Sequence, residues 1–340
     1  MPQCQTSKSA CNMGLTIGLG PAFAGGGGGA SNEIKQFKEL FAIDTLKVHV
    51  RDNTISDFPL IDTSIVTNMY NLFAQNKVIK SVPLLDMQNV TDLRYAFFCC
   101  ESLEEIPLFN TSKAKDVSNM FTNCYVLKEV PLLDLSNAAQ IGGMFQNCRA
   151  LKSIPLFDIS NATYALSLFA GCTSLESVPL LDTSLITNVT QMFDGCSKIR
   201  EIPPFNFASV TSASTVFRNC ISLESVSILN TVKAQSMAMM FDGCTSLKSV
   251  FGLDMKANTN ANYIFRGCTC LETCFIENLK TTISFNASPI LSKESVLFLF
   301  ENAQTVTSTK TITLHADVFA QLTEDEIAIA TEKGFSVVSA

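Results

Sequence analysis

Apolar residues recur along this chain with a period of 24 residues, and the same residue types return at the same place in each period. A phenylalanine marks every unit, and a cysteine follows three residues later in all units except the first, which has Asn76. A period held without insertion indicates a repeat architecture, in which each unit is one small structural element of a stack. The phenylalanines are Phe73, Phe97, Phe121, Phe145, Phe169, Phe193, Phe217, Phe241 and Phe265.

Each unit combines a helical turn with a short extended segment. In Val90, Leu93, Phe97 and Cys100 the apolar spacings of three, four and three residues are typical of one helical face. Two residues after the phenylalanine, seven units carry Asn or Gly, which tolerate the left-handed backbone that ends such a turn. The segment L-x-x-[VI]-P-L predicts a strand of about two or three residues, because proline removes a ladder donor.

A unit of this size cannot bury its own phenylalanine, leucine and valine, so identical units must stack and bury them as ladders. The predicted fold class is α/β, a solenoid of 24-residue units with short parallel strands and short helical turns. A charged column supports direct stacking, because seven of its eight neighbouring pairs have opposite sign. The alternation neutralises the column, which favours a structural ladder over a ligand site. Its members are Lys80, Glu104, Lys128, Lys152, Glu176, Arg200, Glu224, Lys248 and Glu272.

The repeat pattern F-x-[NG]-C-x-x-L-x-x-[VI]-P-L resembles the BspA-like (Treponema pallidum-type) leucine-rich repeats over roughly residues 46–280. Phe145 to Cys148, followed by Leu151, Ile154 and Pro155, is a clean instance. The resemblance implies a leucine-rich-repeat solenoid with binding or adhesion roles and no catalysis. Such repeats occur in bacterial surface adhesins, some protist proteins and phage-encoded structural proteins. Ser227 and Phe251 depart from the pattern by replacing proline, and Cys274 departs by replacing Val or Ile, which indicates decay toward a cap.

The chain divides into four predicted parts. Residues 1–33 form a Gly-rich docking arm, and residues 34–72 form an N-terminal cap with a short amphipathic helix and a degenerate first repeat. Residues 73–280 form the solenoid, and residues 281–340 form a small α/β C-terminal cap. Within the C-terminal cap the sequence predicts helix 292–303, strand 311–315, a helix that opens with a capping box at Thr323 and stops at Gly334, and strand 335–339.

Composition argues against several functions. The net charge of −7 disfavours nucleic-acid binding, and no uncharged apolar run is long enough to cross a membrane. With only His49 and His315, and no convergent set of titratable residues, the sequence predicts no catalytic, cofactor-binding or metal-ligating residues and no enzyme activity. His315 itself is expected to be an ordinary strand residue.

The cysteines invite a metal or disulfide interpretation, but a period of 24 spreads them along a line, one per coil. Because they share the face of the core phenylalanines, buried small hydrophobes are favoured. Cys4, Cys11, Cys270 and Cys274 lie outside the ladder and are the better candidates for a disulfide. The ladder itself comprises Cys100, Cys124, Cys148, Cys172, Cys196, Cys220, Cys244 and Cys268.

One apolar column is a candidate interaction stripe. If Val or Ile points inward, strict alternation turns the second residue after the proline outward, as a row of exposed Leu and Phe. The alternative is that the backbone bends after the proline and places the column in the core. The stripe comprises Leu85, Phe109, Leu133, Phe157, Leu181 and Phe205, with the three phenylalanines as anchors. The Asp or Asn that follows in each unit is expected to form a turn rather than a calcium site.

These observations predict a non-enzymatic binding or adhesion protein. The leading hypothesis is a phage virion component, a receptor-binding or decoration protein that residues 1–33 tether to other virion proteins. Its ligand is expected to be a host-surface protein or glycan, without a cofactor. The alternative is a bacterial cell-surface or secreted adhesin, exported by a weak signal around Met13–Ala24.

Overall fold

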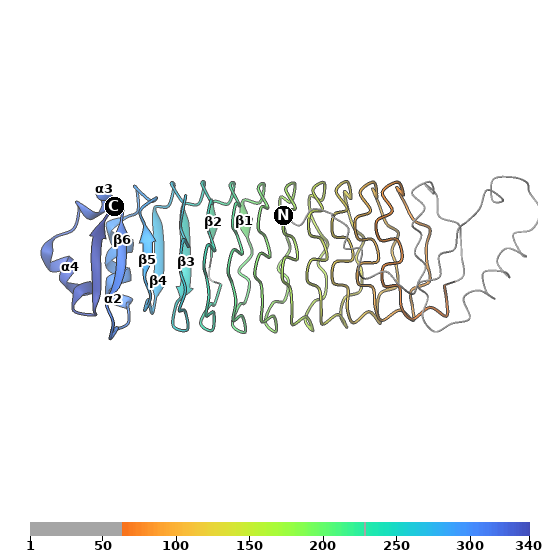
Figure 1. Cartoon of the computed structure of the whole chain (residues 1–340), viewed down its shortest axis with the longest axis horizontal. Coiled ribbons are helices and arrows are strands. Elements are labelled where there is room, and N and C mark those ends of the chain that lie inside the picture. The colour runs from red at the N-terminus through yellow and green to blue at the C-terminus, as the bar shows by residue number, and fades with distance from the viewer. Residues whose placement is uncertain (1–62, 228) are drawn as a thin grey trace, which may run out of the picture.

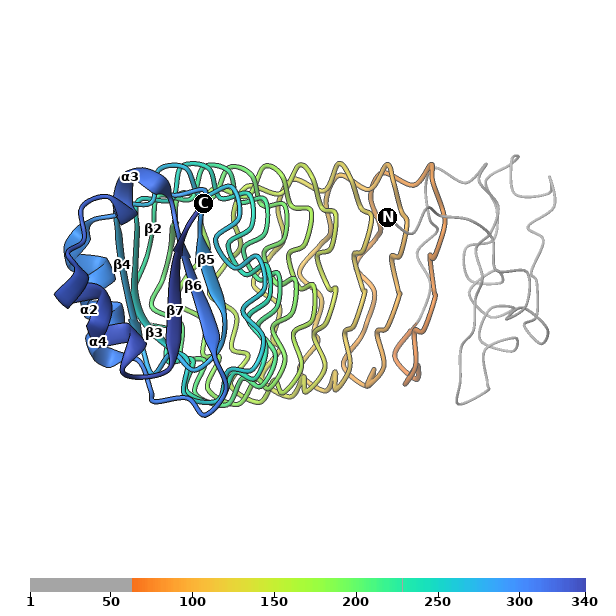
Figure 2. The same cartoon turned by 60° about the vertical axis from the view of Figure 1, so that its left-hand side comes forward.

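The computed structural model describes residues 63–227 and 229–340, which form an elongated rod of stacked coils closed by a cap at its C-terminal end (Figure 1). Turned by 60°, the rod shows the coils following one another along the axis, with the described helices gathered in the cap (Figure 2). The predicted α/β repeat solenoid is confirmed. The predicted arm 1–33 and the amphipathic helix of the N-terminal cap lie outside the described residues.

Equivalent residues of neighbouring coils lie directly beside one another. Isolated parallel bridges begin with Asn68 and Asp92 and continue with the same 24-residue step as far as Asn260. The core phenylalanines stack in the same register, with ring centroids of neighbouring coils 5.1–5.8 Å apart. Because each ring contacts the next, the stack buries apolar surface that no single coil could bury alone.

The predicted helical turn is a series of tight turns rather than an α-helix. Ala96 N donates to Leu93 O and Cys100 N donates to Phe97 O, both at 3.1 Å. Left-handed residues such as Asn123 (φ 64°) end each turn, as the Asn or Gly column predicts. A second left-handed residue stands four positions earlier, for example Asn119 (φ 59°). With left-handed residues at these two positions, every second N–H of the segment points at the next coil. Phe97 N, for example, donates to Met120 O at 2.9 Å.

The longest strands lie in coils that have phenylalanine in place of proline, whereas the coil with Ser227 at that position keeps a strand of two residues. In coils with proline the extended segments share few backbone bonds, such as Glu104 N to Lys80 O at 2.8 Å. Four parallel strands form in the order β1-β2-β3-β4, where β1 is Glu201–Ile202 and β2 is Ser225–Val226. β3 (Ser249–Asp254) and β4 (Thr273–Glu277) have phenylalanine at the proline position and reach six and five residues. Removing proline restores the donor that a longer ladder needs.

The C-terminal cap continues the core and closes it. Phe285 in β5 (Ile283–Phe285) stacks on Phe265 with ring centroids 5.1 Å apart, so the aromatic ladder runs into the cap. A three-stranded parallel sheet has the order β5-β6-β7, with β6 at Lys310–Leu314 and β7 at Phe335–Ser339. The helices are α2 (Lys293–Asn302), α3 (Ala316–Phe319) and α4 (Glu324–Thr331).

The predicted cap elements are confirmed to within a few residues, and Thr323 opens α4 with the predicted capping box. β5 and α3 are additional elements. His315, expected in a strand, lies just after β6 and caps α3, where its Nδ1 accepts from Asp317 N at 3.3 Å.

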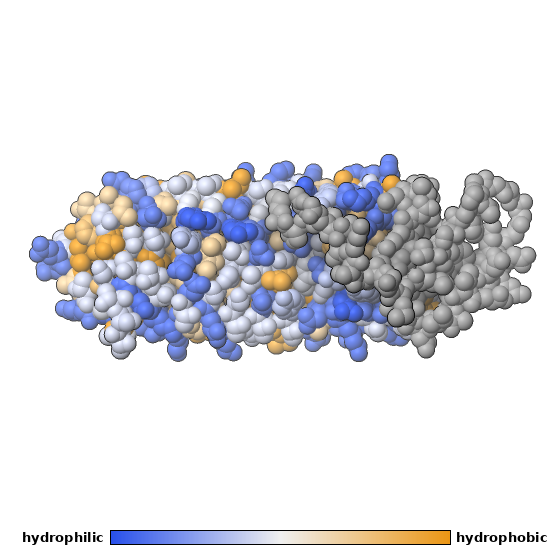
Figure 3. All heavy atoms as spheres, in the orientation of Figure 1, coloured by the Kyte–Doolittle hydropathy of each residue, from blue (hydrophilic) through white to orange (hydrophobic). Residues whose placement is uncertain are grey.

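The outer surface of the rod is mixed. On the face shown in Figure 3, apolar residues lie in small patches between hydrophilic ones along the coils, and the broadest patch covers the C-terminal cap. Within residues 63–227 and 229–340, no helix has the length and apolar character needed to cross a membrane.

Candidate binding surface on the solenoid wall

The predicted interaction stripe lies in the core, so its role as an exposed stripe is wrong, and the alternative of a backbone bend after the proline is confirmed. Its members are only 1–3% exposed. The rings of Phe109, Phe157 and Phe205 stack in parallel on core phenylalanines at 5.9–6.1 Å and widen the aromatic ladder. The buried column comprises Leu85, Phe109, Leu133, Phe157, Leu181 and Phe205.

A tight turn after the proline causes this reversal. Leu133 N donates to Pro131 O at 2.9 Å, and Phe157 N donates to Pro155 O at the same distance. A hydrogen bond between residues two apart closes an inverse γ-turn, because the central residue has no positive φ. The turn breaks strict alternation, so the residue directly after the proline points outward and the next one points inward.

The outward residues form an apolar ridge. Five successive coils each present a leucine that is 57–62% exposed. We call this row the leucine ridge; it comprises Leu84, Leu108, Leu132, Leu156 and Leu180. In the next coil Pro204 takes the place of leucine, and an open hollow of about 320 Å³ lies between it and Leu180. A contiguous exposed apolar row of this kind is typical of an interaction surface, whereas scattered exposed leucines are not.

Carboxylates border the ridge on the side where each unit turns. Two residues after each ridge leucine stands Asp86, Asn110, Asp134, Asp158 or Asp182, and all are exposed. The side chains form the predicted turns, because Ser136 N donates to Asp134 Oδ1 at 3.0 Å and Ser112 N donates to Asn110 Oδ1 at 3.2 Å. The hydroxyl and backbone N–H of Ser160 hold the pKa of Asp158 below its usual value, so its carboxylate is ionised at neutral pH.

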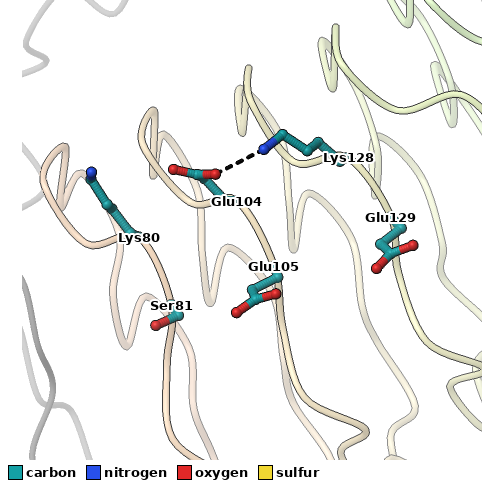
Figure 4. Close-up of a pocket in the computed structure, with 6 residues that line it drawn as sticks. All are labelled: Lys80, Ser81, Glu104, Glu105, Lys128 and Glu129. Atoms are coloured by element: carbon teal, nitrogen blue, oxygen red, sulfur yellow. Dashed lines mark hydrogen bonds and ion pairs between the residues drawn. The ribbon is translucent and has the colours of Figure 1, made fainter.

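On the other side, the ridge faces a column of serine and glutamate. Glu105, Glu129 and Glu201 are exposed there, and the intervening coils carry serine. Part of this border is hollowed: an open depression of about 470 Å³ is lined by Lys80, Ser81, Glu104, Glu105, Lys128 and Glu129 (Figure 4).

The charged column forms ion pairs between neighbouring coils. Lys128 Nζ lies 2.9 Å from Glu104 Oε2 across the hollow (Figure 4), and Lys248 Nζ lies 3.0 Å from Glu224 Oε2. The hydrogen bond and charge of Lys128 lower the pKa of Glu104. Both members of each pair are substantially exposed. The arrangement therefore suits a self-neutralising ladder better than a site for a charged ligand.

The cysteine ladder is a structural feature. All eight ladder thiols have an exposed fraction of 0%. Each donates to a phenylalanine carbonyl oxygen of the preceding coil, as Cys148 Sγ does to Phe121 O at 3.2 Å. Burial raises the pKa of Cys172 and of Cys268 to about 12, which leaves these thiols protonated and unreactive.

The described residues contain no metal cluster of three or more His, Cys, Asp or Glu side chains. Cys270 and Cys274, which the sequence made candidates for a disulfide, are free thiols. Cys4 and Cys11 lie outside the described residues.

Two features of this surface were not predicted from the sequence. The leucine ridge was missed because a proline followed by two apolar residues does not reveal which of the two is exposed. A second charge column was also missed: Arg218 Nε donates to Asp194 Oδ1 at 2.9 Å and Arg266 Nε donates to Asp242 Oδ1 at 2.8 Å. Its signal was the alternation of Asp and Arg directly after four successive core phenylalanines.

The stacked coils define an α/β solenoid of the leucine-rich-repeat type. A family model described as "Mycoplasma protein of unknown function, DUF285" matches residues 36–158 and 163–278. The chain therefore belongs to the DUF285 family, whose repeats are BspA-like.

Among solved structures, the chain is similar to a leucine-rich repeat protein from Bacteroides ovatus at 16% identity, with a TM-score of 0.29. The alignment covers 81% of this chain and 88% of that protein. No curated protein matches the chain.

Proposed function

We propose that this protein is a non-enzymatic binding protein that holds a protein partner against the leucine ridge. The observation that carries the proposal is the exposure of the ridge leucines, 57–62%, next to chain neighbours that are 1–3% exposed. More than half of the surface of each ridge leucine stays exposed in the stack, so their repetition in five coils is better explained by a partner than by folding.

A photo-crosslinking residue placed at position 132 tests this proposal in the cells or particles that contain the protein. We expect a discrete adduct with one protein, and no such adduct from the matched position 185, where Leu185 is 50% exposed but lies outside the ridge. Failure of all five ridge positions to give an adduct, or equal labelling from position 185, would contradict the proposal.

Where the protein acts is a second part of the proposal. A phage virion component, tethered to other virion proteins by residues 1–33 and reaching a host-surface protein or glycan, is supported by the repeat type and the glycine run at 25–29. The family described from Mycoplasma favours the alternative, a bacterial cell-surface or secreted adhesin.

N-terminal sequencing of the native protein, together with immunogold labelling of particles and cells, distinguishes the two. A start near Gly25 with label on the cell surface would exclude the virion. An intact N-terminus with label on particles would exclude export by cleavage.

A further inference from the structure

We infer that the partner segment on the leucine ridge is a basic amphipathic helix, with one apolar residue per turn facing the ridge and Lys or Arg on both flanks. This inference rests on the function proposed above and adds the chemistry of the partner. It is carried by the spacing of the ridge and by the charges on its two borders.

The spacing of the ridge suits a helix. The core phenylalanine rings of these coils have centroids 5.1–5.8 Å apart, and we take this coil-to-coil distance as the spacing of the ridge. An α-helix rises about 5.4 Å per turn, so a helix along the ridge meets each leucine with a residue of its apolar stripe. An extended strand repeats one face about every 6.6 Å and falls out of step within about two coils.

The borders of the ridge select a basic partner. The column on the turn side and the column on the strand side together carry seven carboxylates and no lysine or arginine over the coils from 81 to 206. All seven are exposed; they are Asp86, Asp134, Asp158 and Asp182 on one border and Glu105, Glu129 and Glu201 on the other. The charged column, which directly precedes the strand-side border in each unit, carries Lys80, Lys128, Lys152 and Arg200 against Glu104 and Glu176 over these coils, and Lys128 is paired with Glu104.

The same charges disfavour two other occupants. A second copy of this chain, placed ridge against ridge, would bring acidic borders together in a protein whose net charge is −7. A membrane surface with anionic lipids would be repelled by both borders. A helix that carries lysine or arginine beside its apolar stripe complements both the ridge and the borders.

The probe is a synthetic peptide of about 18 residues, with leucine at i, i+4, i+7 and i+11 and lysine flanking them, added to the full chain and followed by fluorescence anisotropy. Two control peptides have the same composition scrambled or glutamate in place of lysine. We expect binding of the lysine peptide alone, weakened by added salt.

Substitutions in the chain separate ridge from border. Asp134→Asn, Asp158→Asn and Asp182→Asn combined should weaken binding at least about tenfold, because each removes a charge at the border. The fold should persist, since Asn110 already makes the same turn. Leu108→Ser, Leu132→Ser and Leu156→Ser combined should abolish binding, whereas Leu185→Ser should not change it.

The outcomes distinguish the two proposals. If the serine variant loses binding and the asparagine variant does not, or if the glutamate peptide binds equally well, the basic partner is wrong and the ridge remains. If the serine variant binds like the unchanged chain, the ridge itself is wrong. Dimers in analytical ultracentrifugation that the serine variant does not form would identify a second copy of this chain as the occupant of the ridge. Binding to anionic vesicles that the serine variant loses would identify a membrane surface. Either result would overturn the basic helix.

Discussion

Leu132 and Leu133 are adjacent in the chain, yet the side chain of Leu132 is 59% exposed and that of Leu133 is 1% exposed. The hydrogen bond from Leu133 N to Pro131 O, 2.9 Å long, holds this reversal by placing Leu132 at the tip of a tight turn. The same relationship joins Leu156 and Phe157 one coil further on. One local turn thus supplies both the inner wall of the core and the outer ridge.

Alanine substitutions at these two leucines should have very different costs. Leu133→Ala leaves a cavity in a packed core and should lower the free energy of unfolding by about 2–5 kcal/mol. Leu132→Ala removes an exposed side chain and should change it by less than about 0.5 kcal/mol. Urea unfolding followed by circular dichroism measures both. Equal losses, or a larger loss at Leu132, would contradict the turn and indicate strict alternation, with Leu132 buried and Leu133 exposed.

The buried thiols should make stability depend on alkaline pH. Burial raises the pKa of Cys124, Cys148 and Cys196 well above their ordinary value, whereas the thiols of the unfolded chain have a pKa of about 8.5. Below that value both states are protonated and the stabilisation is fully present. Above it the unfolded chain releases protons that the folded chain keeps, so the free energy of unfolding falls by up to about 1.4 kcal/mol per pH unit for each thiol.

Urea unfolding between pH 7.5 and pH 10 tests this linkage. Lysine and tyrosine also titrate in this range, so the comparison is with a Cys148→Ala, Cys196→Ala variant, whose slope should be shallower. An unchanged slope would mean that the folded chain ionises these thiols as readily as the unfolded chain does.

The stacking and most of the cap could be predicted from patterns of residue types in the sequence. A strict period places Phe121 beside Phe145 because identical coils bury identical side chains. Thr323 and Glu326 open α4 through a capping box that depends on two residue types at a fixed spacing. In each case one pattern has one favourable structural solution.

The ridge and the second left-handed position have no comparable pattern. Leu132 and Leu133 are chemically identical, and the turn closed by the hydrogen bond from Leu133 N to Pro131 O decides which one is buried. The second left-handed position holds residues as different as Tyr95, Gly143 and Thr215. There the contacts between coils impose the conformation against the preference of the residue, so composition gives no signal.

Two glycines at one repeat position should respond differently to alanine. Gly171 and Gly195 have the same φ of +76°, so each alanine incurs the left-handed cost of about 1–2 kcal/mol. A Cβ on Gly171 would overlap Asn147 Oδ1, whereas the nearest atom to a Cβ on Gly195 is 3.8 Å away. Gly171→Ala should therefore lower the thermal unfolding temperature more than Gly195→Ala.

Adding Asn147→Gly to Gly171→Ala tests the cause of that difference. The second substitution removes the obstructing amide, whose Nδ2 donates to Asn123 Oδ1 at 2.8 Å. We expect the pair to recover part of the loss in unfolding temperature. No recovery would assign the loss to the backbone conformation alone.

Two charge pairs that join neighbouring coils should differ in strength. Glu104 and Lys128 have side chains that are 43% and 68% exposed, so water and salt screen their attraction, and their coupling should vanish in 0.5 M salt. Asp194 and Arg218 are 13% and 34% exposed, and the guanidinium donates to both carboxylate oxygens. Their coupling free energy should be about 1–2 kcal/mol, less than for a fully buried pair because Arg218 remains partly exposed.

Double-mutant cycles with Glu104→Gln and Lys128→Met, and with Asp194→Asn and Arg218→Met, measure the two couplings in low and high salt. A salt-resistant coupling only at Asp194 and Arg218 would show that the column beside the core phenylalanines fixes neighbouring coils. A stronger coupling at Glu104 and Lys128 would contradict this prediction. It would mean that exposure does not govern the strength of these pairs and that the charged column fixes neighbouring coils instead.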